Sequence, residues 1–227
     1  MKKSTSLDII TGLFVAVLII SNIVSVKVLK FGPFTFDGGT LIFPLAYIFG
    51  DILTEVYGYE RSKRVIWIGF FSCLLMSLTF FIVGYLPADA GWPLQNSYND
   101  ILGFVPRIVL ASLLAYLFGE FSNSFILSKM KIMTKGRFLF LRTIGSTLVG
   151  QIFDTGIFVF AAFAGIYEVK LLVSIAVSNY IFKVVVETIM TPLTYMTINR
   201  LKRKDDSDVY DDKVSYNPFK FSQSSSD

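Results

Sequence analysis

The sequence predicts an all-α membrane protein, a bundle of six transmembrane helices with its N- and C-termini in the cytoplasm. Two features carry this prediction: long apolar runs along the chain, and clusters of lysine and arginine that alternate between the two sides. Hydrophobic residues make up 53% of the 227 residues and charged residues only 17%. Because soluble domains typically carry about 25% charged residues, a soluble fold is disfavoured.

The apolar runs place the spans in order along the chain. A helix needs roughly 20 apolar residues to cross a hydrocarbon core about 30 Å thick, and each run is close to this length. The expected spans are 7–27, 40–58, 65–86, 103–127, 139–165 and 171–198. Their connections are short, so we expect one transmembrane domain over residues 1–199 and a charged, disordered cytoplasmic tail over residues 200–227.

The orientation follows from the positive charges in the connections, because cytoplasmic connections are enriched in lysine and arginine. Thirteen such residues flank the ends placed in the cytoplasm, and three flank the opposite ends. The thirteen are Lys2, Lys3, Arg61, Lys63, Arg64, Lys129, Lys131, Lys135, Arg137, Arg200, Lys202, Arg203 and Lys204; the three are Lys27, Lys30 and Lys170. No small-residue cleavage motif follows the first span, so we do not expect a cleaved signal peptide.

Several classes of function are disfavoured by what the chain does not contain. Histidine is absent and Cys73 is the only cysteine, so an intrachain disulfide is impossible and a metal site would have only oxygen ligands. The sequence contains neither of the two glycine-rich nucleotide-binding motifs, G-x-x-x-x-G-K-[ST] and G-x-G-x-x-G, so ATP hydrolysis is not expected. We therefore predict no cofactor and no catalytic residues. The positive charges lie at helix ends, so no nucleic-acid partner is predicted either.

Polar side chains inside the spans mark the candidate binding site. An ionisable group at the bilayer centre costs roughly 2.5–3.5 kcal/mol on insertion scales, so it usually faces the bundle interior. Three pairs each lie on one helix face, because their members are three or four residues apart: Asp51 and Glu55, Gln151 and Asp154, Lys183 and Glu187. The rise along a helix puts carboxylates from spans 40–58 and 139–165 near Lys183 at mid-membrane, where transporter sites tend to lie.

Internal ion pairs that join the helices are the alternative interpretation, above all for Glu55, Arg142 and Glu187. An intramembrane enzyme would be restricted to serine–lysine or aspartate chemistry, and is disfavoured. A purely structural protein would leave the charges at mid-depth unexplained. Arg107, in the outer part of span 103–127, either anchors that end in the headgroups or points into a cavity.

A short internal repeat relates two of the spans. Residues 46–51 (AYIFGD) match residues 115–120 (AYLFGE), and both spans run from outside to inside. We expect Gly50 and Gly119 to permit close helix approach, and Asp51 and Glu120 to lie at matching depth away from lipid.

Motifs along the chain resemble those of a known family. They are Phe43-Pro44 followed by residues 51–58 (DILTEVYG) and the basic run 61–64, residues 107–112 (RIVLAS), residues 146–155, and residues 180–183 (YIFK). In order and spacing they resemble the queuosine precursor transporter family, also called the vitamin uptake transporter family, over about residues 22–192. The resemblance implies an inner-membrane, multi-pass carrier that imports 7-deazaguanine bases, chiefly 7-cyano-7-deazaguanine, for tRNA modification. By matching position it implies the substrate-binding residues Asn22, Asp51, Arg107, Gln151, Asp154 and Lys183.

The chemistry of these residues suits such a base. A deazaguanine edge offers two adjacent N–H donors and one carbonyl acceptor. Asp154 or Asp51 can accept from the donors, and Gln151, Lys183 or Arg107 can donate to the carbonyl. Tyr47, Tyr116 or Tyr180 could stack on the ring, and Asp154 is the expected site of any coupled proton.

The alternatives are a carrier of another vitamin-like solute, or a substrate-binding subunit of an energy-coupling-factor type transporter. Besides a small-molecule substrate and the lipid bilayer, a homo-oligomer is one option for the assembly, and the sequence leaves it open.

Overall fold

The computed structural model describes residues 5–211 and 216–217, and it is predominantly helical. Five helices are long and apolar enough to cross a membrane: α1 (Thr5–Val24), α3 (Tyr59–Tyr85), α5 (Val105–Met133), α6 (Leu139–Phe163) and α7 (Val169–Asp205). The helices α2 (Pro44–Tyr57) and α4 (Gln95–Leu102) are shorter. The prediction of an all-α membrane protein is confirmed, with a helix in each of the six predicted spans.

The second predicted span differs from a uniform helix over residues 40–58. It is preceded by an antiparallel hairpin of β1 (Val28–Phe31) and β2 (Phe34–Asp37), in which Val28 faces Asp37 and Phe31 faces Phe34. A 3₁₀ helix, η1 (Gly38–Leu41), then leads into the 14 residues of α2. At a rise of 2.0 Å per residue in η1 and 1.5 Å in α2, the two cover about 29 Å, so a broken element replaces one full-length helix.

Two glycines account for the tight turn before α2. A Cβ on Gly38 would overlap the Val24 carbonyl, and one on Gly39 would come 2.6 Å from the Ser21 carbonyl oxygen. The backbone of η1 therefore lies directly against the end of α1, an approach that a side chain would prevent. This contact fixes the hairpin and the start of α2 against α1.

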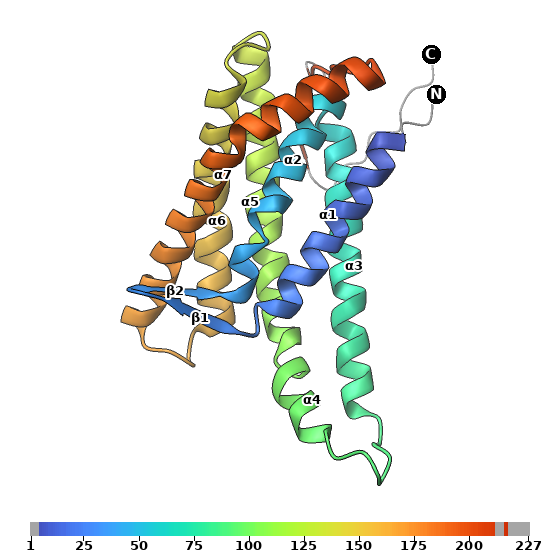
Figure 1. The fold of residues 1–227 in the computed structure, drawn as a ribbon, viewed down its shortest axis with the longest axis vertical. Helices are drawn as coiled ribbons and strands as arrows, with labels where there is room; N and C mark the ends of the chain where they lie inside the picture. The colour runs from blue at the N-terminus through green and yellow to red at the C-terminus, as the bar shows by residue number, and fades with distance from the viewer. Residues whose placement is uncertain (1–4, 212–215, 218–227) are drawn as a thin grey trace.

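The long helices run side by side, and the hairpin lies across the end of the bundle where α1 ends and α7 begins (Figure 1). The ends of α3 and α5, with α4 between them, project beyond the hairpin on this side. Side chains such as Phe71 and Leu75 on α3 and Ile189 on α7 are largely exposed on the outer surface of the bundle. They give the lipid-facing surface that a membrane protein requires.

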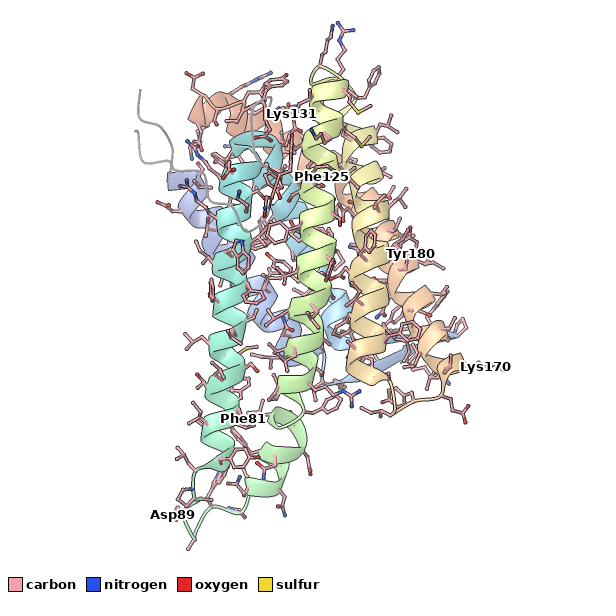
Figure 2. The ribbon with its side chains drawn as sticks, turned by 180° about the vertical axis from the view of Figure 1, so that it is seen from behind. Phe81, Asp89, Phe125, Lys131, Lys170 and Tyr180 are labelled. Carbon is pink, nitrogen blue, oxygen red and sulfur yellow. The ribbon has the colours of Figure 1, made fainter. Side chains whose placement is uncertain are left out.

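The start of α1 and the end of α7 meet at the opposite end of the bundle, where the Ser6 hydroxyl donates to the Asp205 carboxylate at 3.2 Å. Figure 2 shows Lys131 at this end and Lys170 at the other. The arrangement agrees with the orientation inferred from the basic residues, and we refer to the end that holds Lys131 as the cytoplasmic end.

The described part of the predicted tail packs against the cytoplasmic end. Helix α7 continues to Asp205, seven residues past the predicted boundary at 198. Asp211 is buried, and it accepts hydrogen bonds from the backbone N–H of Tyr59 at 3.0 Å and from the Ser128 hydroxyl at 2.6 Å. Disorder therefore does not describe residues 200–211; residues 212–215 and 218–227 lie outside the described part of the chain.

Candidate functional site

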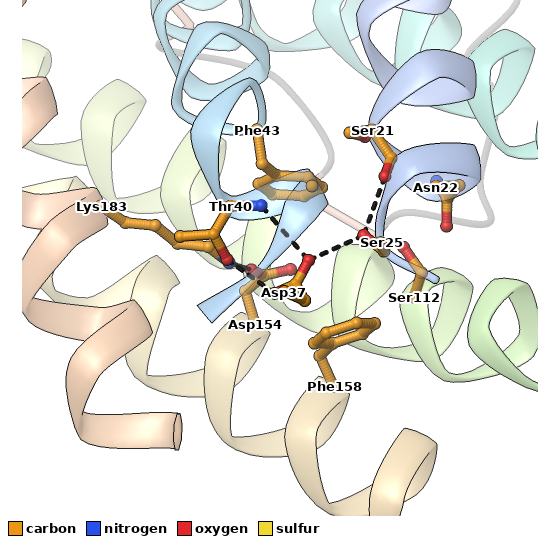
Figure 3. Close-up of a pocket in the computed structure, with 11 residues that line it drawn as sticks. Ser21, Asn22, Ser25, Asp37, Thr40, Phe43, Ser112, Asp154, Phe158 and Lys183 are labelled. Carbon is orange, nitrogen blue, oxygen red and sulfur yellow. Dashed lines mark hydrogen bonds and ion pairs between the residues drawn. The ribbon is translucent and has the colours of Figure 1, made fainter. Parts of the chain in front are cut away.

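A small polar pocket lies inside the bundle, toward the end that carries the hairpin (Figure 3). Four helices, α1, α5, α6 and α7, contribute to its walls together with β2, η1 and the residue before α2. The pocket therefore lies where these segments meet. Its lining side chains include Ser21 and Asn22 from α1, Ser25 just after α1, Asp37 from β2, Thr40 from η1, Phe43 before α2, Ser112 from α5, Asp154 and Phe158 from α6, and Lys183 from α7.

The charged centre of the pocket is an ion pair between α6 and α7. The Lys183 ammonium donates to Asp154 Oδ2 at 2.8 Å, and both side chains are almost completely buried. The ammonium also lies 4.5 Å from the centroid of the Phe43 ring, a distance at which a cation is attracted to the ring face. The structure thus brings together the carboxylate of the fifth predicted span and the lysine of the sixth, as their depths indicated.

Asp37 is the charged residue of the pocket that the sequence analysis missed. Its Oδ1 accepts from the Ser25 hydroxyl at 2.8 Å and from the Thr40 backbone N–H at 3.2 Å. Its Oδ2 accepts from the Thr40 hydroxyl at 2.6 Å and from the Asn179 amide at 3.1 Å. Four donors from three elements satisfy this carboxylate, which caps η1 and ties the hairpin to α1 and α7. The signal in the sequence was Asp37 three residues before Thr40, a helix-capping pattern in a connection outside the predicted spans.

Two further predicted residues lie at or beside the pocket. Asn22 lines it, with its amide donating to the Leu18 carbonyl at 2.8 Å. Gln151 is fully buried one turn before Asp154 on α6. The Asn22 carbonyl oxygen and the Gln151 amide nitrogen have no hydrogen-bond partner among the described residues. Both residues therefore keep unused hydrogen-bonding capacity inside the protein.

Asp51 belongs to a second group, which we call the carboxyl cluster and define as Asp51, Glu120 and Glu187. Asp51 accepts from the Asn123 amide at 2.9 Å and lies beside Glu187, which accepts from the Thr147 hydroxyl. Glu120 lies against Gly50, where an added Cβ would overlap its carboxyl group. As expected from the repeat, Asp51 and Glu120 face the bundle interior, and Gly50 permits the close approach of the Glu120 side chain.

Arg107 lies away from the pocket. Its side chain is exposed at the outer end of α5, where it donates to the Ala164 carbonyl at 2.6 Å and so joins α5 to the α6–α7 connection. Tyr180, proposed as a stacking residue, also lies on the outer surface of the bundle (Figure 2) and contacts the Leu148 carbonyl. The aromatic rings that line the pocket are those of Phe43 and Phe158.

Glu55 is the centre of a network of ion pairs near the cytoplasmic end. The guanidinium of Arg142 donates to both of its carboxylate oxygens, with Nη2 to Oε1 at 3.2 Å, and the Lys202 ammonium lies 2.7 Å from Oε1. Lys131 lies 3.6 Å from Glu55 and 2.7 Å from Asp208, which also pairs with Lys202 at 2.9 Å. For Glu55 and Arg142 the structure therefore shows internal ion pairing. This network joins α2, α5, α6 and α7 near the cytoplasmic end.

The pocket is contracted in this structure. Its volume is about 20 Å³ when measured at the centre of a water molecule, which is room for about one water. Pockets that enclose organic ligands typically measure about 300–1,000 Å³. A solute larger than a few atoms therefore needs the hairpin or a helix to move before it can reach Asp154 and Lys183.

A multi-pass bundle with a buried carboxylate–ammonium pair in a contracted interior pocket is the architecture of a membrane transporter for a small polar solute. The chain belongs to the family described as putative vitamin uptake transporter, whose model matches residues 37–197. It is thus a transporter of the bacterial inner membrane and not an enzyme.

Curated relatives support the assignment to this family. A Bacillus subtilis (strain 168) protein named probable queuosine precursor transporter is 35% identical over 191 residues, which cover 81% of this chain and 82% of the relative. The queuosine precursor transporter of Escherichia coli (strain K12) is 26% identical over 73% of this chain and 74% of its own length. No solved structure was found to match the chain.

Proposed function

We propose that the protein imports queuosine precursors, chiefly 7-cyano-7-deazaguanine, into the cytoplasm for tRNA modification, and that the base binds at Asp154 and Lys183. The observation that carries this proposal is the buried ion pair of these two residues on the pocket wall. The names of the curated relatives support the class of substrate. Since the pair costs free energy to bury in a membrane, a role in recognition explains its presence better than a role in packing.

The hydrogen-bonding pattern of a deazaguanine matches this pair. The two adjacent N–H donors of its pyrimidine edge fit the two oxygens of the Asp154 carboxylate, and its carbonyl fits the Lys183 ammonium. The unpaired carbonyl oxygen of Asn22 and amide of Gln151 supply one further acceptor and one further donor. A base that lacks one of these groups would leave a buried partner unpaired, which gives strong discrimination.

The rings of Phe43 and Phe158 are placed to stack on such a base once the pocket opens. Phe43 already lies over the Lys183 ammonium. In the proposed complex the base enters beside Lys183, so the contact between the ring and the cation changes with binding. Asp51 and Arg107 do not line the pocket, and we place their roles elsewhere.

The test is direct binding to the purified protein by titration calorimetry. 7-Cyano-7-deazaguanine should bind more tightly than 7-aminomethyl-7-deazaguanine, queuine or guanine. Asp154→Asn and Lys183→Ala should each weaken binding at least tenfold, because losing a hydrogen bond to a charged group costs about 1.5–3 kcal/mol. The matched controls are Asp89→Asn and Lys170→Ala, both on exposed side chains at the outer end of the protein (Figure 2).

Unchanged affinity in both pocket variants would move the site away from Asp154 and Lys183. Tighter binding of a vitamin-like solute than of any deazaguanine would favour the alternative substrate class. Uptake by the purified protein alone in liposomes would exclude a requirement for a separate ATPase subunit.

A further inference from the structure

The carboxyl cluster is not used by the proposed binding of the base. Asp51, Glu120 and Glu187 come from α2, α5 and α7, and each side chain is at most 3% exposed. None of the three has an ion pair with a lysine or arginine among the described residues: the buried cations Arg142 and Lys183 pair with Glu55 and Asp154. The hydrogen-bond donors from other residues are neutral, Asn123 to Asp51 and Thr147 to Glu187.

The proximity of these carboxyl groups favours protonation. Asp51 and Glu187 lie close enough to interact directly, and two carboxyl groups can share a hydrogen bond only if one of them carries a proton. Oε1 of Glu120 and Oε2 of Glu187 are buried and have no partner among the described residues. Three uncompensated negative charges in this interior would be very costly, whereas protonation removes that cost.

Other titratable and charged groups lie near the cluster on α2, α5, α6 and α7. They are Tyr47 and Glu55 on α2, Tyr116 on α5, Arg142 and Asp154 on α6, and Lys183 on α7. Asp154 differs from the cluster in having a counter-charge, because the Lys183 ammonium lies 2.8 Å from its Oδ2. The described residues include no group of three acidic side chains arranged as metal ligands, which favours a proton over a divalent cation.

The cluster and the pocket are mechanically connected. Glu187 follows Lys183 by one turn of α7, and Thr147 precedes Gln151 by one turn of α6, so a shift of either helix at the pocket also moves the cluster. Gly119, next to Glu120 on α5, lies against Asp154: an added Cβ would come 2.6 Å from the Asp154 Cβ. A base that separates Lys183 from Asp154 would therefore also disturb the hydrogen bonds of Glu187.

We propose that the carboxyl cluster of Asp51, Glu120 and Glu187 is a proton-binding site that couples inward proton movement to uptake of the base. The inference rests on the proposed function, because it concerns the ion that drives the same transport. A proton taken up from the outside loads the cluster, moves inward with the base, and leaves to the cytoplasm. No bond other than that to the proton is made or broken.

The test uses purified full-length protein in liposomes, with membrane potential clamped by potassium and valinomycin and a pH dye inside. Labelled 7-cyano-7-deazaguanine is added outside at a more acidic pH than the lumen. If one proton accompanies each base, one pH unit should give about tenfold accumulation, since one pH unit is worth 1.36 kcal/mol. Adding the base should also acidify the lumen.

Glu187→Gln should lose accumulation driven by the pH gradient, because a glutamine cannot carry the proton. It should retain exchange of labelled for unlabelled base, because the pocket is unchanged. Glu120→Gln is the second variant, and Glu168→Gln, on an exposed residue before α7, is the matched control. If Glu187→Gln fails to fold, Glu120→Gln applies the same test to the cluster. Accumulation driven by the pH gradient that persists in the folded variants would overturn the assignment of the proton to the cluster.

Equal final base concentrations at every pH gradient, with no acidification of the lumen, would overturn the inference and leave the proposed function standing. Accumulation driven by a sodium gradient alone would overturn it as well. Absence of any uptake or exchange of the base would contradict the proposed function itself, and the inference with it.

Discussion

Replacing Glu55 by glutamine tests the energetics of the cytoplasmic network most sharply. The Glu55 side chain is completely buried, and it accepts two hydrogen bonds from Arg142, whose side chain is 1% exposed. In Glu55→Gln one carboxylate oxygen becomes an NH₂ group that points at a guanidinium. Lys202 is 20% exposed and keeps Asp208 as a partner, so the main loss falls on Arg142.

The expected cost is large because a buried cation is left without its counter-charge. Breaking a buried ion pair by removing one partner costs about 3–5 kcal/mol, and the remaining amide oxygen keeps one hydrogen bond, so we expect about 3 kcal/mol. For a chain of this length that corresponds to a fall in Tm of roughly 6–12 °C.

The measurement is thermal unfolding of the detergent-solubilised protein, followed by tryptophan fluorescence. Glu168→Gln, which makes the same chemical change on an exposed side chain, should leave Tm nearly unchanged. In the double variant Glu55→Gln, Arg142→Gln the uncompensated charge is gone, so its loss should be clearly smaller than the sum of the single losses. A single-variant loss below about 1 kcal/mol, or strict additivity, would refute the reasoning.

Three further predictions follow from single contacts. Gly119→Ala should lower Tm by the equivalent of about 1–3 kcal/mol and weaken base binding, because its Cβ would press on Asp154; Gly12→Ala, with open space around it, is the control. Asp37→Asn places an amide among four donors, so it should lower Tm by a similar amount, and unchanged melting would contradict its role in anchoring the hairpin. Partial burial opposes ionisation of Asp208, but hydrogen bonds from two lysines prevail and lower its pKa below the usual 3.8. Its charge therefore stabilises the fold above that pH, and the stabilisation is lost as the pH falls through the lowered value. The Tm deficit of Asp208→Asn should thus be small at neutral pH and vanish in acid, and a deficit that persists in strong acid would contradict the ion pairing.

Hydropathy and lysine placement predicted much of the fold because both depend directly on whether a segment lies in lipid or in water. They identified the five full-length helices and their direction. They did not predict the hairpin or η1, since a broken element has the same apolar content as a helix, and residues 40–58 were taken as one span. The glycines at 38 and 39 and Pro44 marked the break, but only the packing against α1 showed how the chain turns.

The sequence predicted those contacts of the candidate site that follow from the depth of each residue in the membrane. Depth along α6 and α7 placed Asp154 near Lys183, and the two do meet. Depth does not say which way a side chain faces, so Asp51 was expected at the same lysine but instead contacts Asn123 and Glu187. Asp37 was missed for a different reason: it lies in a connection, where an acidic residue carries no cost that would draw attention to it.

The packed tail has a practical consequence for protein engineering. A chain cut after Ile198, where the last apolar run ends, would retain every spanning helix but lose Lys202, Asp208 and Asp211 together. Lys131 would then lose its Asp208 partner and the Val209 carbonyl, and the backbone of Tyr59 would lose its acceptor. Affinity tags and fluorescent fusions therefore belong after Asp227, because a shortened tail would remove Lys202 and Asp208 from the cytoplasmic ion-pair network.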